Sequence, residues 1–162
     1  MKTEVIETER LVLKPFLVIG PKSEYPSWLN DPEVVRYSRQ RFQKHTKETC
    51  EEYLRSFDHI KNHIWAIHAR NGDVHIGNIT AHRNNTYGTI EIGILMGNRA
   101  YWGKRLGLEA WEGVLNHLRT HEEDIIIRAG CHKDNLPMKK ILQRTMIYDS
   151  AHGDDVLYWK PV

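Results

Sequence analysis

The residues best suited to chemistry lie in one loop of the sequence, between Gly97 and Gly107. An apolar run that ends at Met96 enters this loop, which contains three glycines, and an amphipathic pattern follows it. Glycines let a backbone approach a ligand closely, and the first turn of a helix offers unpaired N–H groups to an anion. The spacing therefore predicts a site for a phosphate-bearing ligand, although a loop of this kind also serves as a plain structural connection.

Other motifs that carry chemistry are absent or weak. The loop is not a Rossmann fingerprint, because G-x-G-x-x-G is missing, and it is not a P-loop, because no Gly-Lys-Ser/Thr ends it. Two histidine pairs have the i,i+4 spacing that can hold a metal, His59 with His63 and His117 with His121. Neither pair has an evident third ligand and H-E-x-x-H does not occur, so we expect surface histidines and no metal.

Hydrophobic patterns predict the strands that must position the loop. Asn71-Gly72 marks a hairpin, and the apolar run Ile125 to Ile127 lacks alternation, which predicts a strand that is covered on both faces inside the sheet. The expected strands are Glu9 to Phe16, Ile64 to Ala69, Val74 to His82, Thr89 to Met96, Ile125 to Ile127 and Asp155 to Trp159.

Capping residues and apolar stripes predict four helices. Asp31 is expected to cap a first helix with Pro32 in its first turn, and Thr46 to cap a second. A third follows the glycine loop to about Thr120, and Asn135 starts a fourth. The order of elements indicates an α/β (α+β) domain with a mixed, mostly antiparallel sheet flanked by helices.

Composition limits the classes of function. The 162 residues, 40% hydrophobic and 27% charged, are expected to form one domain over 1–162. A net charge of +2 does not favour nucleic acid as a partner. Two cysteines far apart suggest reduced thiols in a cytoplasmic protein, and neither a signal peptide nor a membrane span is expected.

Four segments, in the same order, resemble the GNAT superfamily of acyl-CoA-dependent N-acyltransferases, and within it the branch of the ribosomal-protein alanine N-acetyltransferases. They are Thr8 to Pro15, Trp28 to Val34, Ile90 to Ile94 followed by Tyr101 to Lys104, and Asn135 to Leu142. The resemblance implies a GNAT-like domain that binds acetyl-CoA and a primary amine, with no nucleic acid or membrane as partner. Whether it forms a homodimer is left open.

The resemblance also assigns cofactor-binding residues. Backbone amides of the loop would hold the pyrophosphate, an arrangement that the helix dipole favours. The end of the central strand would pair with the pantetheine arm as an added strand does. One departure is that Arg105 stands where the family pattern has its central glycine. The residues assigned to acetyl-CoA are Leu95, Met96, Trp102, Gly103, Lys104, Arg105, Leu106, Gly107, Leu108 and Asn135.

Glu91 is the candidate general base, since attack on a thioester needs a neutral amine and many relatives carry a glutamate on this strand. A solvent-facing strand glutamate is the alternative. The tyrosine that protonates the thiolate in many relatives is replaced by Leu142, which leaves Tyr148 and Cys131 as candidates, or solvent. These losses also motivate a second hypothesis, a non-catalytic acyl-CoA-binding or regulatory module. The acceptor is either a protein N-terminus or a small amine such as an amino sugar.

Overall fold

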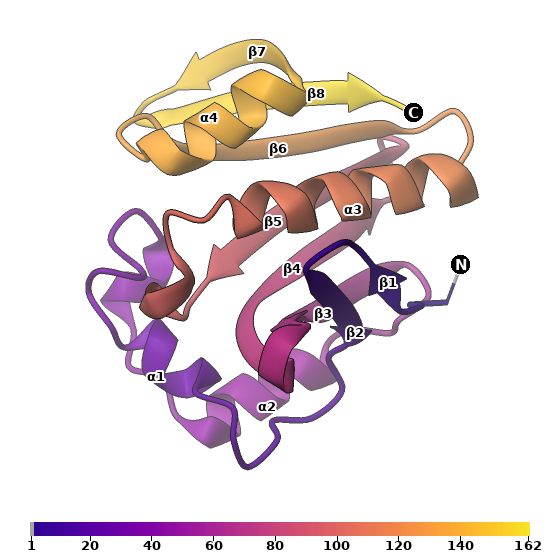
Figure 1. Ribbon diagram of the computed structural model, residues 1–162. Helices are drawn as coiled ribbons and strands as arrows, with labels where there is room; N and C mark the ends of the chain where they lie inside the picture. The colour runs from indigo at the N-terminus through magenta and orange to yellow at the C-terminus, as the bar shows by residue number, and fades with distance from the viewer. Residues whose placement is uncertain (1) are drawn as a thin grey trace.

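A mixed sheet with the strand order β1-β2-β3-β4-β5-β6-β8-β7 is the frame of the computed structural model, which describes residues 2–162 (Figure 1). Neighbouring strands run antiparallel except β5 and β6, which are parallel. The strands are β1 Ile6–Glu7, β2 Leu11–Pro15, β3 Asn62–Ala69, β4 Val74–Asn84, β5 Thr89–Met96, β6 Ile126–His132, β7 Ile147–His152 and β8 Asp155–Pro161.

Helices cover both faces of the sheet. The helices α3 (Leu106–His121) and α4 (Leu136–Thr145) lie on one face, and the short α1 (Tyr25–Leu29) and α2 (Lys47–Arg55) lie on the other (Figure 1). Strand β3 is buried from both sides, because Trp65 packs in the cluster with α3 while Ile64 packs in the cluster with α1 and α2. At 16 residues α3 is the longest described helix, and no described helix suits a membrane span.

The parallel pairing of β5 with β6 is short, and this decides where a site can form. Only residues 89–91 of β5 pair with 126–128 of β6. Beyond them, within residues 2–162, β5 stays paired with β4 alone, and β6 with β8 alone. The two central strands therefore separate, and Ile92 to Met96 present an unpaired backbone edge toward the gap.

Several sequence predictions are confirmed because local chemistry sets them. The strand over residues 89–96 and the helix that follows the glycine loop occur as expected. Thr46 caps α2 in a capping box, where its hydroxyl accepts from Thr49 N–H while the Thr49 hydroxyl accepts from Thr46 N–H. The Asn135 side chain accepts from Met138 N–H, 3.2 Å away, at the start of α4.

Three predictions were wrong. His63, expected at the surface, is 3% exposed within β3. Asp31 begins a single turn rather than a helix; Val34 and Val35 N–H donate to its carbonyl, and these β-branched residues do not favour a further turn. The helix of this region, α1, ends just before it. In β6, Ile126 is 38% exposed, because α1 and α2 do not extend over that part of the sheet. Strand β6 does lie inside the sheet, but it is covered on one face.

Candidate active site

A cleft of about 1590 Å³ opens where β5 and β6 separate. Its walls come from the unpaired end of β5, the glycine loop with the first turn of α3, the region from β6 to α4, and the segment from α1 to α2. Nine of the ten residues assigned to acetyl-CoA line it; they are Leu95, Met96, Trp102, Gly103, Arg105, Leu106, Gly107, Leu108 and Asn135. Lys104 is the exception, and its ammonium group instead lies 5.3 Å from the centre of the Tyr101 ring.

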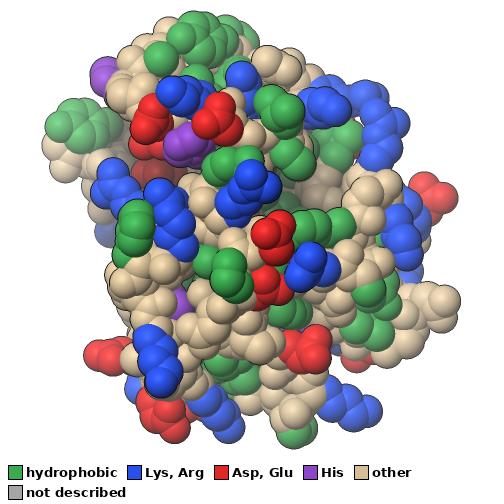
Figure 2. Space-filling model, turned by 90° about the vertical axis from the view of Figure 1, so that its left-hand side faces the viewer, with side chains coloured by type: hydrophobic (Ala, Val, Ile, Leu, Met, Phe, Trp, Pro, Cys, Tyr) green, Lys and Arg blue, Asp and Glu red, His purple; other side chains and the backbone are tan. Residues whose placement is uncertain are grey.

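The charge of the cleft suits an anionic ligand. The basic side chains in its lining are Arg36, Arg105, Lys140 and Arg144, while Glu33 is the one carboxylate among the described lining residues. Figure 2 shows Lys and Arg side chains spread across the face that is at the left of Figure 1. An excess of fixed positive charge of this kind attracts phosphate groups.

The three glycines of the loop have different physical roles. A Cβ atom on Gly97 would overlap the Trp28 indole, so this glycine serves packing rather than ligand approach. Gly103 has φ +76°, which glycine adopts at little cost. Gly107 has a conventional backbone, and a Cβ there would meet Met96 and Ile141 at ordinary contact distances.

Arg105 occupies a backbone conformation that favours glycine. It precedes α3 with φ 61° and ψ 20°, in the left-handed region. The first bond of α3 runs from Glu109 N–H to Arg105 O, and in residues 2–162 the backbone N–H groups of Leu106, Gly107 and Leu108 have no protein acceptor. Three N–H groups at the positive end of the helix are therefore available to an anion in the cleft.

The end of β5 offers backbone groups to the same cleft. Gly97 N–H donates to Ile76 O on β4, so alternation directs the backbone groups of Met96 and Ile94 toward the unpaired edge. The Trp102 indole N–H donates to Met96 O at 2.7 Å and occupies that carbonyl. Met96 N–H and both groups of Ile94 remain to pair with an extended amide-bearing chain.

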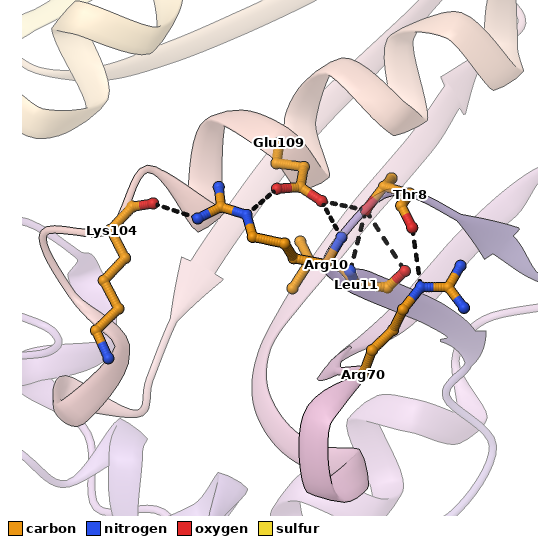
Figure 3. Close-up of polar contacts among 6 residues, drawn as sticks. All are labelled: Thr8, Arg10, Leu11, Arg70, Lys104 and Glu109. Carbon is orange, nitrogen blue, oxygen red and sulfur yellow. Dashed lines mark hydrogen bonds and ion pairs between the residues drawn. The ribbon is translucent and has the colours of Figure 1, made fainter.

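A polar network behind the loop holds it against the first strands (Figure 3). Glu109, in the first turn of α3, accepts from the Thr8 hydroxyl at 2.6 Å and from Arg10 Nε at 2.7 Å. Arg10 Nη1 donates to Lys104 O at 3.1 Å. In the sequence, Thr8 and Arg10 are recognisable only as part of a motif, because their partners lie about a hundred positions away.

Of the three candidate acid–base residues, Glu91 and Tyr148 are not in the lining of the cleft. Glu91 is exposed on β5, on the strand face of Gly93 and Leu95, and two residues short of Gly93, which lines the cleft. Tyr148 is on β7, 56% exposed, with its ring 5.6 Å from that of Tyr158. Cys131 does line the cleft, and burial raises the pKa of its thiol to about 11. Their catalytic roles stay predictions.

Several lining residues escaped the sequence analysis. Tyr25, Tyr53 and Cys50 meet on the side formed by α1 and α2, and burial raises the pKa of the Tyr25 hydroxyl far above its usual range. Asn78 is 4% exposed and lines the cleft, and its Nδ2 has no hydrogen-bond partner in residues 2–162. No sequence signal marks these residues, because only the packing of distant elements brings them together.

One group of possible metal ligands occurs elsewhere in the described chain. Glu4 supplies a third ligand atom beside His117 and His121, all within 4.8 Å of one another. This third ligand is not evident in the sequence, because Glu4 lies more than a hundred positions before the histidines. His121 is fifteen residues beyond Leu106, about 22 Å along α3 from the loop at a rise of about 1.5 Å per residue. The group is therefore separate from the cleft.

Three solved structures are similar to this protein over nearly its whole length. A GNAT-family acetyltransferase from Bacillus anthracis has a TM-score of 0.74 and 21% identity, over 98% of each chain. RimL, described as a ribosomal L7/L12 alpha-N-protein acetyltransferase in complex with coenzyme A, has a TM-score of 0.75 and 12% identity, over 98% of each chain. The microcin C7 self-immunity acetyltransferase MccE, in complex with acetyl-CoA and AMP, has a TM-score of 0.75 and 13% identity, over 96% of this chain and 94% of the other.

These structures share the fold with the protein. No curated protein matches the sequence. The model of the acetyltransferase (GNAT) domain matches residues 10–145, which is most of the chain and includes β5, the glycine loop, α3 and α4. The protein therefore belongs to the GNAT acetyltransferase domain family.

Proposed function

We propose that the protein transfers an acetyl group from acetyl-CoA to a primary amine, directly, in a ternary complex. One observation carries the proposal: the unpaired edge of β5 and the free N–H groups of α3 meet in one cleft with a basic lining. An amide-bearing arm and a pyrophosphate are joined in coenzyme A, and the cleft offers a matching surface for each. RimL and MccE, which share the fold, are described as complexes with coenzyme A and acetyl-CoA.

The residues have the following proposed roles toward acetyl-CoA. Leu106, Gly107 and Leu108 N–H groups bind the pyrophosphate, with the Arg105 guanidinium adding a charge-assisted bond. Met96 and Ile94 pair with the pantetheine arm through the open edge of β5. A backbone N–H on this edge polarises the thioester carbonyl, as an oxyanion-type donor does. Asn135 closes the opposite wall while it caps α4.

Glu91 is the proposed base, acting through water. Its Cα is about 6.6 Å along the strand from that of Gly93, at a rise of about 3.3 Å per residue. A carboxylate on the same strand face as the cleft can therefore relay a proton from the amine through one or two waters. Tyr148 lies outside the lining, so we propose that solvent protonates the departing thiolate.

The raised pKa of the Cys131 thiol favours direct transfer of the acetyl group rather than transfer through an acyl-enzyme on this cysteine. Its pKa of about 11 keeps the thiol protonated at neutral pH, so the nucleophilic thiolate is scarce. The same pKa makes it a weak proton donor to another thiolate. We therefore give Cys131 a packing role in the wall of the cleft.

The acceptor is a primary amine, either a protein N-terminus or a small-molecule amine such as an amino sugar. RimL, described as an alpha-N-protein acetyltransferase, favours the first by analogy of fold. The tyrosines on the side of α1 and α2 favour the second, because an aromatic pocket suits a small molecule.

A non-catalytic acyl-CoA-binding module is the alternative, favoured by the position of Glu91 and Tyr148 outside the lining. Calorimetry with acetyl-CoA, followed by a CoA-release assay over a panel of amines, separates the two. We expect 1:1 binding and turnover of at least one amine. Tight binding with no turnover of any amine would establish the alternative, and no binding would defeat both.

A further inference from the structure

Asn78 carries a buried hydrogen-bond donor that has no acceptor among the residues that the structure describes. It lies on β4 directly opposite Leu95 of β5, so both side chains are on the face of the sheet that α1 and α2 cover. The residue is 4% exposed and lines the cleft, and its Nδ2 atom has less than 1 Å² of exposed surface. Its Oδ1 has a partner in His75, whereas its Nδ2 has none in residues 2–162.

The orientation of the Asn78 amide is fixed by its neighbours. His75 Nε2 lies 3.0 Å from Gly77 O and 2.8 Å from the Asn78 amide oxygen. A carbonyl only accepts, so Nε2 must carry the proton, and the amide must turn its oxygen toward it. His75 Nδ1 then accepts from the Ser23 hydroxyl, 3.0 Å away. The Asn78 NH₂ group is left facing away from this chain of bonds.

Aromatic packing holds the His75 ring in place. Its centroid lies 5.0 Å from that of Phe16 and 4.8 Å from that of Trp28. Burial lowers the pKa of His75 to about 4, so the ring is neutral at physiological pH and carries one proton. A chain of hydrogen bonds therefore runs from Ser23 through His75 to the amide oxygen of Asn78. It leaves the Asn78 NH₂ group without an acceptor in residues 2–162.

A buried donor without a partner is costly, and native structures seldom keep one without a reason. A neutral NH₂ group brings no charge of its own, so an uncharged acceptor such as a carbonyl oxygen satisfies it without leaving a charge unpaired. Thr80, the next residue on this face of β4, already directs its hydroxyl to Gly93 O at 3.4 Å. Of the two β4 residues that line the cleft, Asn78 is thus the one whose side-chain donor has no acceptor in residues 2–162.

We propose that Asn78 Nδ2 donates a hydrogen bond to a carbonyl oxygen of the reacting ligands, and that His75 and Ser23 are the residues that position it. The assignment rests on the proposed acetyl transfer. Two carbonyls have this chemistry, the thioester carbonyl of acetyl-CoA and a carbonyl next to the acceptor amine. The experiment distinguishes them.

The variants are Asn78→Asp, which keeps the oxygen bound by His75 and replaces the donor with an acceptor, and Asn78→Ala. The matched control is Asn84→Asp, at the exposed end of the same strand, where Oδ1 accepts from Thr86 N–H at 3.1 Å. Thermal unfolding of each variant establishes that it folds before its binding is compared.

The first arm is calorimetry with acetyl-CoA and with CoA, which lacks the thioester carbonyl. If Asn78 binds that carbonyl, both variants lose acetyl-CoA affinity by about 5- to 50-fold and keep their CoA affinity. The second arm compares kcat/KM for alanine amide and for isopropylamine, which has no carbonyl. If Asn78 binds the acceptor, the rate for alanine amide falls by about 5- to 50-fold and that for isopropylamine does not.

Either selective loss, absent in Asn84→Asp, supports the assignment. An equal loss toward acetyl-CoA and CoA overturns it, because that result indicates a general disturbance of the cleft. The assignment is also overturned if both variants keep their acetyl-CoA affinity and show no selective loss of kcat/KM for alanine amide. This holds as well when neither amine is acetylated by the wild type. A wild-type protein that binds no acetyl-CoA defeats the proposed function itself, independently of residue 78.

Discussion

Arg10 and Glu109 form an ion pair, 2.7 Å from Nε to Oε2, between residues 99 positions apart in the chain. The pair joins the residue just before β2 to the first turn of α3, and Arg10 also holds the carbonyl of Lys104 in the glycine loop (Figure 3). Glu109 Oε1 accepts a second bond from Arg10, from its backbone N–H, at 2.7 Å. The loop that forms one wall of the cleft is thus held in place from outside the cleft.

Replacing Glu109 with glutamine is expected to loosen this attachment. The neutral amide keeps the shape but loses charge-assisted bonds to a half-exposed arginine, a loss of about 1 to 2 kcal/mol in the free energy of unfolding. Affinity for acetyl-CoA should fall by a few-fold, because Lys104 is held less firmly. Urea unfolding and calorimetry measure the two effects. The control is Glu112→Gln, exposed on the same helix; equal effects there would show that the ion pair has no special role.

Arg105 is expected to reduce stability and to aid binding. Its positive φ disfavours a residue with a Cβ, so Arg105→Gly should raise the free energy of unfolding by about 0.5 to 1 kcal/mol. The same change removes a guanidinium from the cleft and should weaken acetyl-CoA binding about 10-fold. Arg105→Asn separates the effects, since asparagine tolerates this conformation without the charge. Tighter binding by the glycine variant would show that the side chain obstructs the site.

Glu91→Gln is expected to lower kcat by about 10² to 10⁴ without changing the dissociation constant of acetyl-CoA, because a proton relay acts only in the chemical step. Steady-state kinetics and calorimetry test this. The parallel variant Glu33→Gln removes the carboxylate of the cleft lining. If that variant loses activity while Glu91→Gln retains it, the base is Glu33.

Acid should destabilise the protein through two histidines, the buried His63 and the partly buried His75. Burial lowers the pKa of His63 and of His75 to about 4, against about 6.5 in an unfolded chain. The unfolded state therefore binds more protons between pH 6.5 and 4, so stability is complete above pH 6.5 and declines as pH falls through this window. Each histidine contributes a slope of up to about 1.4 kcal/mol per pH unit.

Chemical unfolding at several pH values checks this expectation. The variant His63→Phe, which keeps a ring stacked on Trp65, should show a shallower slope than the wild type. An unchanged slope would mean that other groups take up the protons.

Sequence patterns determined the elements whose causes are local. The strand from Thr89 to Met96, the helix after the glycine loop and the caps at Thr46 and Asn135 depend on residues within a few positions of one another. Nine of the ten residues assigned to acetyl-CoA line one cleft for the same reason, since most of them are consecutive in the loop and the start of its helix.

Tertiary structure decided the features of the fold and the cleft that depend on residues far apart in the chain. The separation of β5 from β6 follows from a pairing only three residues long, and no local pattern sets that length. Gly97 is required by an indole from α1, and Ile126 is exposed because no helix reaches it. The donor on Asn78 is free because His75 fixes the other end of its amide. A sequence states which groups can bind, but only the packed chain decides which are already bound to one another and which are left for a ligand.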